Sequence, residues 1–286
     1  MSKSIEALLA EVESRLLDMA PEALGSEPSL RAVNEQALAA GGGRKRARIT
    51  LQVSMDLGLS PADAVCLASV VEALHQASLV HDDLQDKDAE RRGQPAVWSV
   101  HGDAVAICLG DALIANSFAQ LSHLSNPLWI GTLLTHVSQA VSNMSAGQAL
   151  DCTQPNLDDF SVYLQVTANK SGSLLSLPLV LPMVCAGVNQ ALIDSAWRAA
   201  RAIGIGYQLA DDWVDREQDR GQHLNGYWVL FNECGSDAAV ELASQFNHQI
   251  LSALRDSNGC PRAVKLAIAH LAGWLRGRFP ELSEAA

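Results

Sequence analysis

The sequence predicts an all-α protein, because apolar residues recur at helical spacing along most of its length and strand signals are missing. The run Ile5, Leu8, Leu9, Val12 and Leu16 places its apolar side chains on one helical face. Nowhere do alternating β-branched residues stand between tight glycine turns, as an exposed strand would require. We therefore expect roughly ten or more helices in one domain that spans residues 1–286.

Helix starts and breaks are marked by residues with special backbone preferences. Ser60-Pro61-Ala62-Asp63 combines an N-cap, a proline in the first turn and an early acid, and Asn126-Pro127 repeats this pattern. Breaks are expected at Gly41-Gly42-Gly43, at Arg92-Gly93-Gln94-Pro95, around Pro155 and from Gly221 to Gly226. None of these connections is rich enough in Gly, Ser or Pro to act as a linker between domains.

Composition excludes some classes of function. The 286 residues carry a formal net charge of −12, and an acidic chain is a poor candidate for nucleic-acid binding, so we expect no nucleic-acid partner. The six cysteines are widely scattered without a C-x-x-C pair, which argues against a zinc site and against a disulfide framework. Together with an N-terminal helix pattern that lacks an apolar signal core, they predict a cytoplasmic protein.

One uncharged stretch, Ser171–Ile193, is about long enough to span a bilayer. It contains Pro178, Pro182 and several serines, and no belt of Trp and Tyr flanks it. A helix buried on all sides in a large helical core fits this composition better. We therefore predict no membrane span.

Two acidic clusters share the pattern D-D-x-x-D, at Asp82–Asp86 and at Asp211–Asp215, each at the end of an apolar helical run. Residues four apart share a helical face, so the outer aspartates of each cluster project together. Carboxylates crowded against an apolar surface repel one another unless cations neutralise them. Mg²⁺ fits best, because it prefers oxygen ligands and is commonly held by one or two carboxylates together with phosphate oxygens.

Basic residues gather at three places: Arg44–Arg48 after the triple glycine, Arg91-Arg92 after the first acidic cluster, and Lys170 before the uncharged stretch. Arg binds phosphate through planar bidentate contacts and Lys binds it as a point charge, so these residues indicate a strongly anionic ligand such as a diphosphate. His75 lies seven residues before Asp82 and shares its helical face. The residues alone leave open whether His75 is a hydrogen-bonded core histidine or a ligand-binding one.

These residues resemble the trans-isoprenyl diphosphate synthases, a family of head-to-tail prenyltransferases. The matching segments follow the family's order and approximate spacing. They are RKRAR (Arg44–Arg48), EALHQASLVHDDLQD (Glu72–Asp86), RRGQP (Arg91–Pro95), GDALI (Gly110–Ile114), GQALD (Gly147–Asp151), KSG (Lys170–Gly172) and GYQLADDWVD (Gly206–Asp215). A single D-D-x-x-D would be a weak signal, whereas the whole ordered set is highly specific.

The resemblance implies an antiparallel helix bundle around a deep central cavity, with both acidic clusters at its mouth, and a homodimer. It implies a reaction that condenses isopentenyl diphosphate with an allylic diphosphate to give an all-trans prenyl diphosphate. It also implies a set of site residues. The expected ligands of three Mg²⁺ ions are Asp82, Asp86, Asp211, Asp212 and Asp215. Arg91, Lys170 and Gln208 are expected to bind the allylic diphosphate, and Lys45, Arg48, His75 and Arg92 to bind isopentenyl diphosphate. The expected catalytic residues are Asp82, Asp86, Lys170, Gln208 and Asp211.

The resemblance also has an implication for the length of the product. In the family, bulky aromatic side chains just before the first acidic cluster stop chain growth early. Here Ala77 and Ser78 stand at those places, and both are small. We therefore predict a farnesyl or longer product, with geranylgeranyl diphosphate favoured.

The chain departs from the family pattern after Asp215. The family normally carries a loop there with a lysine that contacts the allylic diphosphate, whereas Arg216–Gly235 is shorter and contains no lysine. Arg220 and His223 are the candidate substitutes. Smaller departures are Arg44 in place of a second glycine, Ile49 in place of a proline and Ser171 in place of a threonine.

Two alternatives stay open. A terpene cyclase on the same helical scaffold would ionise a prenyl diphosphate without isopentenyl diphosphate, and would have no need of Lys45, Arg48, His75 and Arg92. A noncatalytic subunit of a heteromeric synthase would have no reason to keep two crowded carboxylate clusters, which cost stability. The sequence therefore favours a chain-elongating prenyltransferase.

Overall fold

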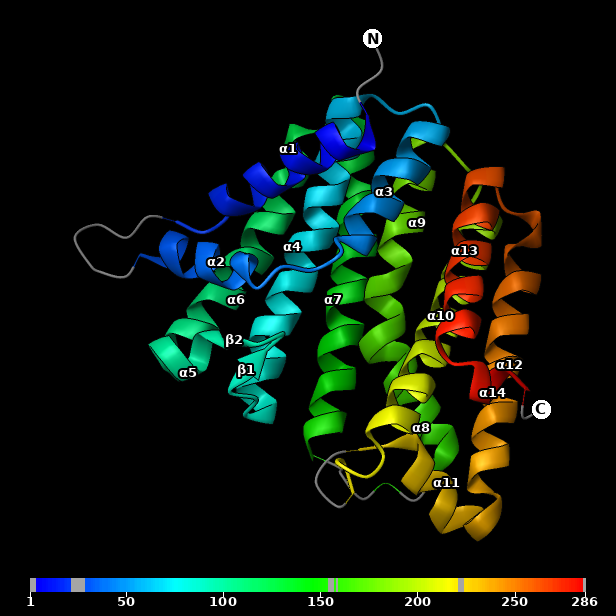
Figure 1. Ribbon diagram of the computed structural model, residues 1–286. Helices are drawn as coiled ribbons and strands as arrows, with labels where there is room; N and C mark the ends of the chain where they lie inside the picture. Colours follow the sequence, from blue (N-terminus) through cyan, green and yellow to red (C-terminus); the bar gives the residue numbers. More distant parts are fainter. Residues whose placement is uncertain (1–3, 22–28, 154–156, 158, 221–223, 285–286) are drawn as a thin grey trace. The chain divides into compact units, whose positions relative to one another are not determined.

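Figure 1 shows the computed structural model, in which nearly all regular structure is helical. The structure describes residues 4–21, 29–153, 157, 159–220 and 224–284. The main helices are α1 (Ile5–Asp18), α2 (Leu30–Ala39), α3 (Lys45–Asp56), α4 (Pro61–Asp86), α5 (Val97–His101), α6 (Asp103–Gln120), α7 (Ile130–Thr153), α8 (Phe160–Thr167), α9 (Ser173–Cys185), α10 (Gln190–Asp215), α11 (Gly226–Cys234), α12 (Ala238–Asp256), α13 (Arg262–Arg278) and α14 (Pro280–Glu284). Single turns of other helix types are η1 (Leu121–His123), η2 (Pro127–Trp129), η3 (Ala168–Gly172), η4 (Gly235–Asp237) and η5 (Ser257–Gly259). The all-α prediction is confirmed, and the expected breaks around Pro155 and at Gly221 lie outside the described residues.

Contacts divide the chain into two compact units, which are described separately. Unit 1 comprises Met1–Val137 and Leu181–Ala186, and unit 2 comprises Ser138–Val180 and Gly187–Ala286. The boundaries fall inside α7 and α9, so these two helices run from one unit into the other. The single domain over residues 1–286 stays a prediction.

Unit 1 is built around α4, which contacts α1, α3, α5 and α6. Its start is the expected one, because the Ser60 hydroxyl accepts a hydrogen bond from the Asp63 amide and Pro61 occupies the first turn. Residues 63–74 are all buried, whereas the second half of the helix has a partly exposed stripe. The stripe consists of His75, Ser78, Leu79, Asp82 and Asp86. Its spacing of three and four residues places it on one face of α4.

A short β-hairpin follows α4, which the sequence did not predict. Strand β1 (Glu90–Arg91) pairs antiparallel with β2 (Gln94–Pro95). Between them Arg92 and Gly93 have φ angles of 54° and 74°, and two positive values are what a two-residue type I′ turn requires. Two-residue strands are too short to show an alternating pattern in the sequence, so only the turn at this position could be recognised.

Unit 2 is built around α10, which contacts α8, η3, α11, α12 and α13 (Figure 1). The uncharged stretch that precedes it contains the buried helix α9, which has 13 residues and is shorter than a bilayer requires. Two other helical segments are long and apolar enough to cross a membrane by length and composition. They are Pro61–Asp86, 78% buried over its apolar window, and Asp103–His123, 33% buried. The absence of a membrane span stays a prediction.

Candidate functional site

The first acidic cluster occupies the last turns of α4 in unit 1. Asp82 and Asp86 belong to the partly exposed stripe, whereas Asp83 is buried. The Arg91 Nε donates a hydrogen bond to Asp83 Oδ1 at 2.5 Å, which joins the hairpin to α4. Burial raises the pKa of Asp83, and the ion pair with Arg91 opposes that shift. The middle aspartate, Asp83, therefore has a structural role. It holds Arg91, which was expected to bind substrate, beside the cluster.

A positively charged region adjoins the same face of α4. Arg46 Nη1 lies 3.0 Å from His75 Nε2. Burial, together with the charges of Arg46, Arg92, Arg91 and Arg44, lowers the pKa of His75 well below its usual value. The imidazole is therefore neutral, and its Nε2 accepts a hydrogen bond from the Arg46 guanidinium. Four arginines thus lie near enough to this uncharged histidine to influence its pKa, and guanidinium groups suit an anionic ligand.

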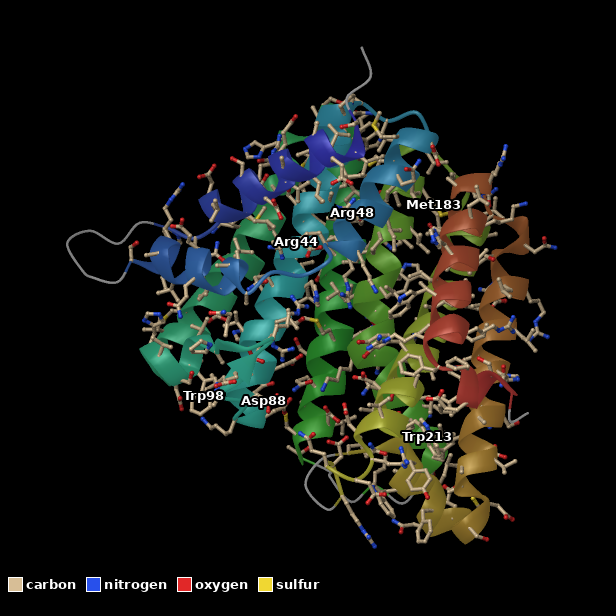
Figure 2. The ribbon with its side chains drawn as sticks, viewed as in Figure 1. Arg44, Arg48, Asp88, Trp98, Met183 and Trp213 are labelled. Atoms are coloured by element: carbon tan, nitrogen blue, oxygen red, sulfur yellow. The ribbon has the colours of Figure 1, made fainter. Side chains whose placement is uncertain are left out.

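The three other basic residues of the same segment are placed differently. Arg48, predicted to bind isopentenyl diphosphate, pairs with Glu6 of α1 through contacts of 2.5 and 3.0 Å (Figure 2). Arg44 is largely buried and lies 3.6 Å from Glu72. Lys45 is exposed at the first position of α3. The structure thus brings Arg46, which was not assigned a role from the sequence, to His75 and directs Arg48 toward α1. The spacing of the motif alone did not distinguish these two arginines.

Arg92 links the hairpin to the glycine-rich segment before α3. Its Nη1 donates to the carbonyl of Gly41, and its guanidinium would collide with a Cβ atom at Gly42. Gly42 also has a φ of 143°, which L side chains rarely adopt. The triple glycine therefore lets the Arg92 side chain approach the backbone closely. This places Arg92 near enough to His75 for its charge to lower the pKa of that residue.

The second acidic cluster occupies the end of α10 in unit 2, and its middle aspartate is again buried. Asp212 accepts hydrogen bonds from Tyr163 Oη at 2.5 Å, from the Gly226 amide at 2.6 Å and from Gln208 Nε2 at 2.9 Å. Burial raises the pKa of Asp212 to about 7 even though these bonds oppose the shift. Gln208 also accepts a hydrogen bond from Ser171 at 3.2 Å. Asp212, predicted to be a metal ligand, is thus placed as an anchor between α8, α10 and α11.

The outer aspartates of this cluster, Asp211 and Asp215, are half-buried. Burial, with the negative charges of Asp215 and Asp219, raises the pKa of Asp211 to about 6. Asp219 is a third member that was missed, although it repeats the four-residue spacing of Asp211 and Asp215. It lies beyond the helix end and accepts a hydrogen bond from Asn225 at 2.9 Å. The cluster is therefore a stripe of three crowded carboxylates.

Lys170 lies in η3, a π-helical turn of unit 2, where its ammonium group pairs with Asp151 of the GQALD segment. Single π-turns are rare and often occur at functional sites. This one is pressed against α10, because a Cβ atom at Gly204 would lie 2.6 Å from Gly172 Cα. The two glycines thus permit a close contact that fixes the turn that carries Lys170.

The lysine-free segment after Asp215 contains two arginines stacked on tryptophans. The Arg216 guanidinium carbon lies 4.0 Å from the ring centroid of Trp213 (labelled in Figure 2), and that of Arg220 lies 4.5 Å from Trp228. Such stacking leaves the in-plane N–H groups able to donate, and Arg216 Nη1 donates a hydrogen bond to the Trp213 carbonyl. His223, the other candidate substitute, lies outside the described residues.

Magnesium fits the outer aspartates of both clusters, although within the described part of the chain no group of three or more His, Cys, Asp or Glu side chains could hold a metal ion by itself. Mg²⁺ usually takes one or two carboxylates and completes its shell with water and phosphate oxygens. The crowding that raises the pKa of Asp211 is negative charge that a bound cation would neutralise. Each carboxylate pair thus offers part of a Mg²⁺ shell, which water and phosphate oxygens would complete.

The comparisons with known proteins agree on one family. Residues 27–225 match the family model described as polyprenyl synthetase. The chain is 32% identical over 230 residues to a geranylgeranyl pyrophosphate synthase of Geoglobus acetivorans, which covers 79% of this chain and 68% of that protein. It is 31% identical over 191 residues to a geranylgeranyl diphosphate synthase of Mycobacterium tuberculosis, which covers 65% of this chain. The match spans only 55% of the length of the Mycobacterium protein.

Solved structures support the fold. A geranylgeranyl pyrophosphate synthetase from Geoglobus acetivorans superposes with a TM-score of 0.77 at 24% identity, over 96% of this chain and 99% of that one. A decaprenyl diphosphate synthase from Rhodobacter capsulatus gives 0.78 at 21% identity, over 96% and 97%. At such identities the likeness shows the all-α fold and leaves the reaction to be argued from the site.

Proposed function

The chain belongs to the polyprenyl synthetase family, and on that premise we propose that it is a Mg²⁺-dependent prenyltransferase that joins isopentenyl diphosphate to an allylic diphosphate. The product is an all-trans prenyl diphosphate. One observation carries the proposal: a carboxylate pair shares one face of α4 with His75, a neutral histidine that Arg46 of α3 contacts. A magnesium-bound diphosphate needs both kinds of group, because the metal requires oxygen ligands and the phosphates require donors.

In this proposal the chain's own residues bind and orient two anionic substrates. Asp82, Asp86, Asp211 and Asp215 would be carboxylate ligands of the Mg²⁺ that carries the allylic diphosphate. The ammonium group of Lys170, which pairs with Asp151, would stabilise the negative charge on the leaving phosphate oxygens. Bound Mg²⁺ supplies a Lewis acid that stabilises the negative charge on the departing diphosphate. The double bond of isopentenyl diphosphate, held close by the basic residues of unit 1, attacks the allylic cation. The proton lost at the end goes to the departing diphosphate.

Isopentenyl diphosphate is assigned to the region around His75. We propose Arg46, Lys45 and Arg92 as its ligands, with Arg46 in the role that the sequence had assigned to Arg48. The contact between Arg46 and His75 supports this exchange, because a neutral imidazole that accepts one N–H fixes the guanidinium while leaving its other donors for phosphate. Arg48 instead stabilises the packing of α3 on α1 through Glu6.

A farnesyl or longer product, with geranylgeranyl diphosphate favoured, is proposed from the small residues before the first acidic cluster. Ser78 lies on the partly exposed stripe of α4, whereas Ala77 is fully buried in the core of unit 1. Ser78→Phe is therefore the sharper test, since a phenylalanine at Ala77 would also overpack the core at a cost of about 1–3 kcal/mol. The expected result is a shorter product from Ser78→Phe, measured by chromatography, and unchanged product length would contradict the assignment.

We also propose a cytoplasmic homodimer formed through α6. The segment Asp103–His123 is apolar yet only 33% buried within the chain, and Ile107 and Cys108 on it are exposed. A second copy would cover this face, as large exposed apolar patches commonly mark interfaces. Ile107→Glu should convert the dimer to a monomer in light scattering with size-exclusion chromatography. A monomeric wild-type protein, or one recovered only in membranes, would contradict this proposal.

The reaction is tested by incubating the protein with radiolabelled isopentenyl diphosphate, Mg²⁺ and each of dimethylallyl, geranyl and farnesyl diphosphate in turn. The expected outcome is label in an elongated prenyl diphosphate, and none when EDTA is present. Cyclised hydrocarbon without label would favour a terpene cyclase. The absence of turnover with every primer would favour a noncatalytic subunit, and either result would overturn the proposal.

A further inference from the structure

Helices α10 and α13 of unit 2 lie in contact and run in the same direction (Figure 1), and two contacts define their register. At their starts, Cys260 Sγ lies 3.6 Å from the Leu192 carbonyl. Near their ends, Tyr207 stacks on Trp274 with ring centroids 6.2 Å apart and an interplanar angle of 13°. The residue numbers differ by 68 in the first contact and by 67 in the second. The difference between paired positions of α10 and α13 is therefore nearly constant along both helices.

This register brings one basic residue beside the second acidic cluster. Arg278 follows Trp274 by four residues, as Asp211 follows Tyr207, so each lies about one turn beyond the stacked pair. The electrostatics agree with this placement. The pKa of Asp211 is raised by burial and by Asp215 and Asp219, and the positive charge of Arg278 lowers it in part.

The backbone under Arg278 is fixed while its side chain is exposed. Phe279 and Leu282, which follow it, are buried, and the Asn247 side chain of α12 donates a hydrogen bond to the Leu282 carbonyl at 2.7 Å. The Arg278 guanidinium carbon lies 5.6 Å from the Phe279 ring centroid. The end of α13 therefore presents a cation from an ordered support, which is the condition for a precise contact with a ligand.

We propose that Arg278 is a substrate-binding residue that contacts the diphosphate held at Asp211 and Asp215. The identity of the diphosphate as the head of an allylic substrate rests on the proposed function. The guanidinium of Arg278 is always charged, and its in-plane N–H donors suit phosphate oxygens. It would supply the positive charge that the lysine-free segment after Asp215 does not provide through a lysine. It comes from the C-terminal end of α13, far along the sequence from that segment.

The test is calorimetric titration of the full chain with Mg²⁺ alone and then with inorganic pyrophosphate in the presence of Mg²⁺. Arg278→Gln should bind Mg-pyrophosphate at least about tenfold more weakly, as expected for the loss of a charge-assisted contact. Arg278→Lys should recover part of the affinity. Mg²⁺ alone should bind Arg278→Gln as well as or better than wild type, because a repelling positive charge has been removed. Arg276→Gln, two residues earlier on the same helix, is the matched control and should behave as wild type.

Two results would overturn the inference. One is equal pyrophosphate affinity in Arg278→Gln and Arg276→Gln. The other is a parallel loss of Mg²⁺ and pyrophosphate binding in Arg278→Gln with a lower melting temperature, because that combination indicates a structural role. The proposed function would be contradicted by a different result, the absence of turnover by wild type with isopentenyl diphosphate. The pyrophosphate comparison could be interpreted in that case as well.

Discussion

In unit 1 the middle aspartate of the D-D-x-x-D pattern is buried against an arginine, whereas in unit 2 it is buried among neutral donors. Asp83 pairs with Arg91, while Asp212 accepts only from Tyr163, Gln208 and a backbone amide in the contacts described above. Burial raises the pKa of both carboxyls, and that of Asp212 reaches about 7. The first cluster thus carries its own counter-charge in Arg91. In the second, the outer aspartates and Asp219 crowd negative charge that a bound cation would relieve.

The largest effect should separate outer from middle aspartates. Asp82→Asn and Asp211→Asn should each lower kcat/KM by about a hundred- to a thousandfold, because each removes a proposed ligand of the Mg²⁺ that would stabilise the leaving diphosphate. Asp211→Asn should melt at the same or a higher temperature than wild type without metal, since it removes a crowded carboxylate whose pKa is raised to about 6. Steady-state kinetics and thermal denaturation check both results. Wild-type activity in either variant would contradict the shared role of the outer aspartates.

The middle aspartates should show the opposite pattern, a loss of stability. Asp83→Asn leaves Arg91 without its charged partner, and Asp212→Asn disturbs three hydrogen bonds in a buried position. Each should lower the free energy of unfolding by about 2 kcal/mol in urea denaturation. Tyr163→Phe, which removes one donor to Asp212, should cost about 1 kcal/mol. If Asp215→Asn, the matched control, destabilised the protein as much, the division between outer and middle positions would be wrong.

The basic region of unit 1 can be tested by replacing Arg46 and Arg48 one at a time. Arg46→Gln should raise the KM for isopentenyl diphosphate about tenfold or more, because it removes a charge-assisted phosphate contact. Arg48→Gln should leave the KM near that of wild type, since Arg48 pairs with Glu6. The KM for the allylic substrate should stay unchanged in both. An effect confined to Arg48→Gln would restore the assignment made from the sequence.

A smaller effect should appear in the pH dependence of Mg²⁺ binding. Because the pKa of Asp211 is raised to about 6, protons should compete with Mg²⁺ and weaken its binding as the pH falls through 6. The folded-state pKa of Asp211 lies above its ordinary value of 3.8, so without metal the free energy of unfolding should fall as the pH rises from 3.8 through 6. The Mg²⁺ affinities of wild type and Asp211→Asn, measured against pH, should diverge as the pH rises through 6. Identical profiles would contradict the raised pKa.

The sequence predicted the helical fold and the two acidic clusters because both depend on short-range patterns. Apolar spacing showed the helices, and the capping residues at Ser60-Pro61 placed the start of α4. It did not distinguish Arg46 from Arg48, because that choice depends on how α3 packs against α1 and α4. Arg278 could not be found either, since its place beside Asp211 follows from the register of two helices far apart in the chain.

The most direct measurement of the central claim is Mg²⁺-dependent binding of pyrophosphate to wild type, Asp82→Asn and Asp211→Asn. Each variant should lose most of the binding free energy, because each removes a proposed carboxylate ligand of the Mg²⁺ that carries the diphosphate. Wild-type affinity in both variants would contradict the account.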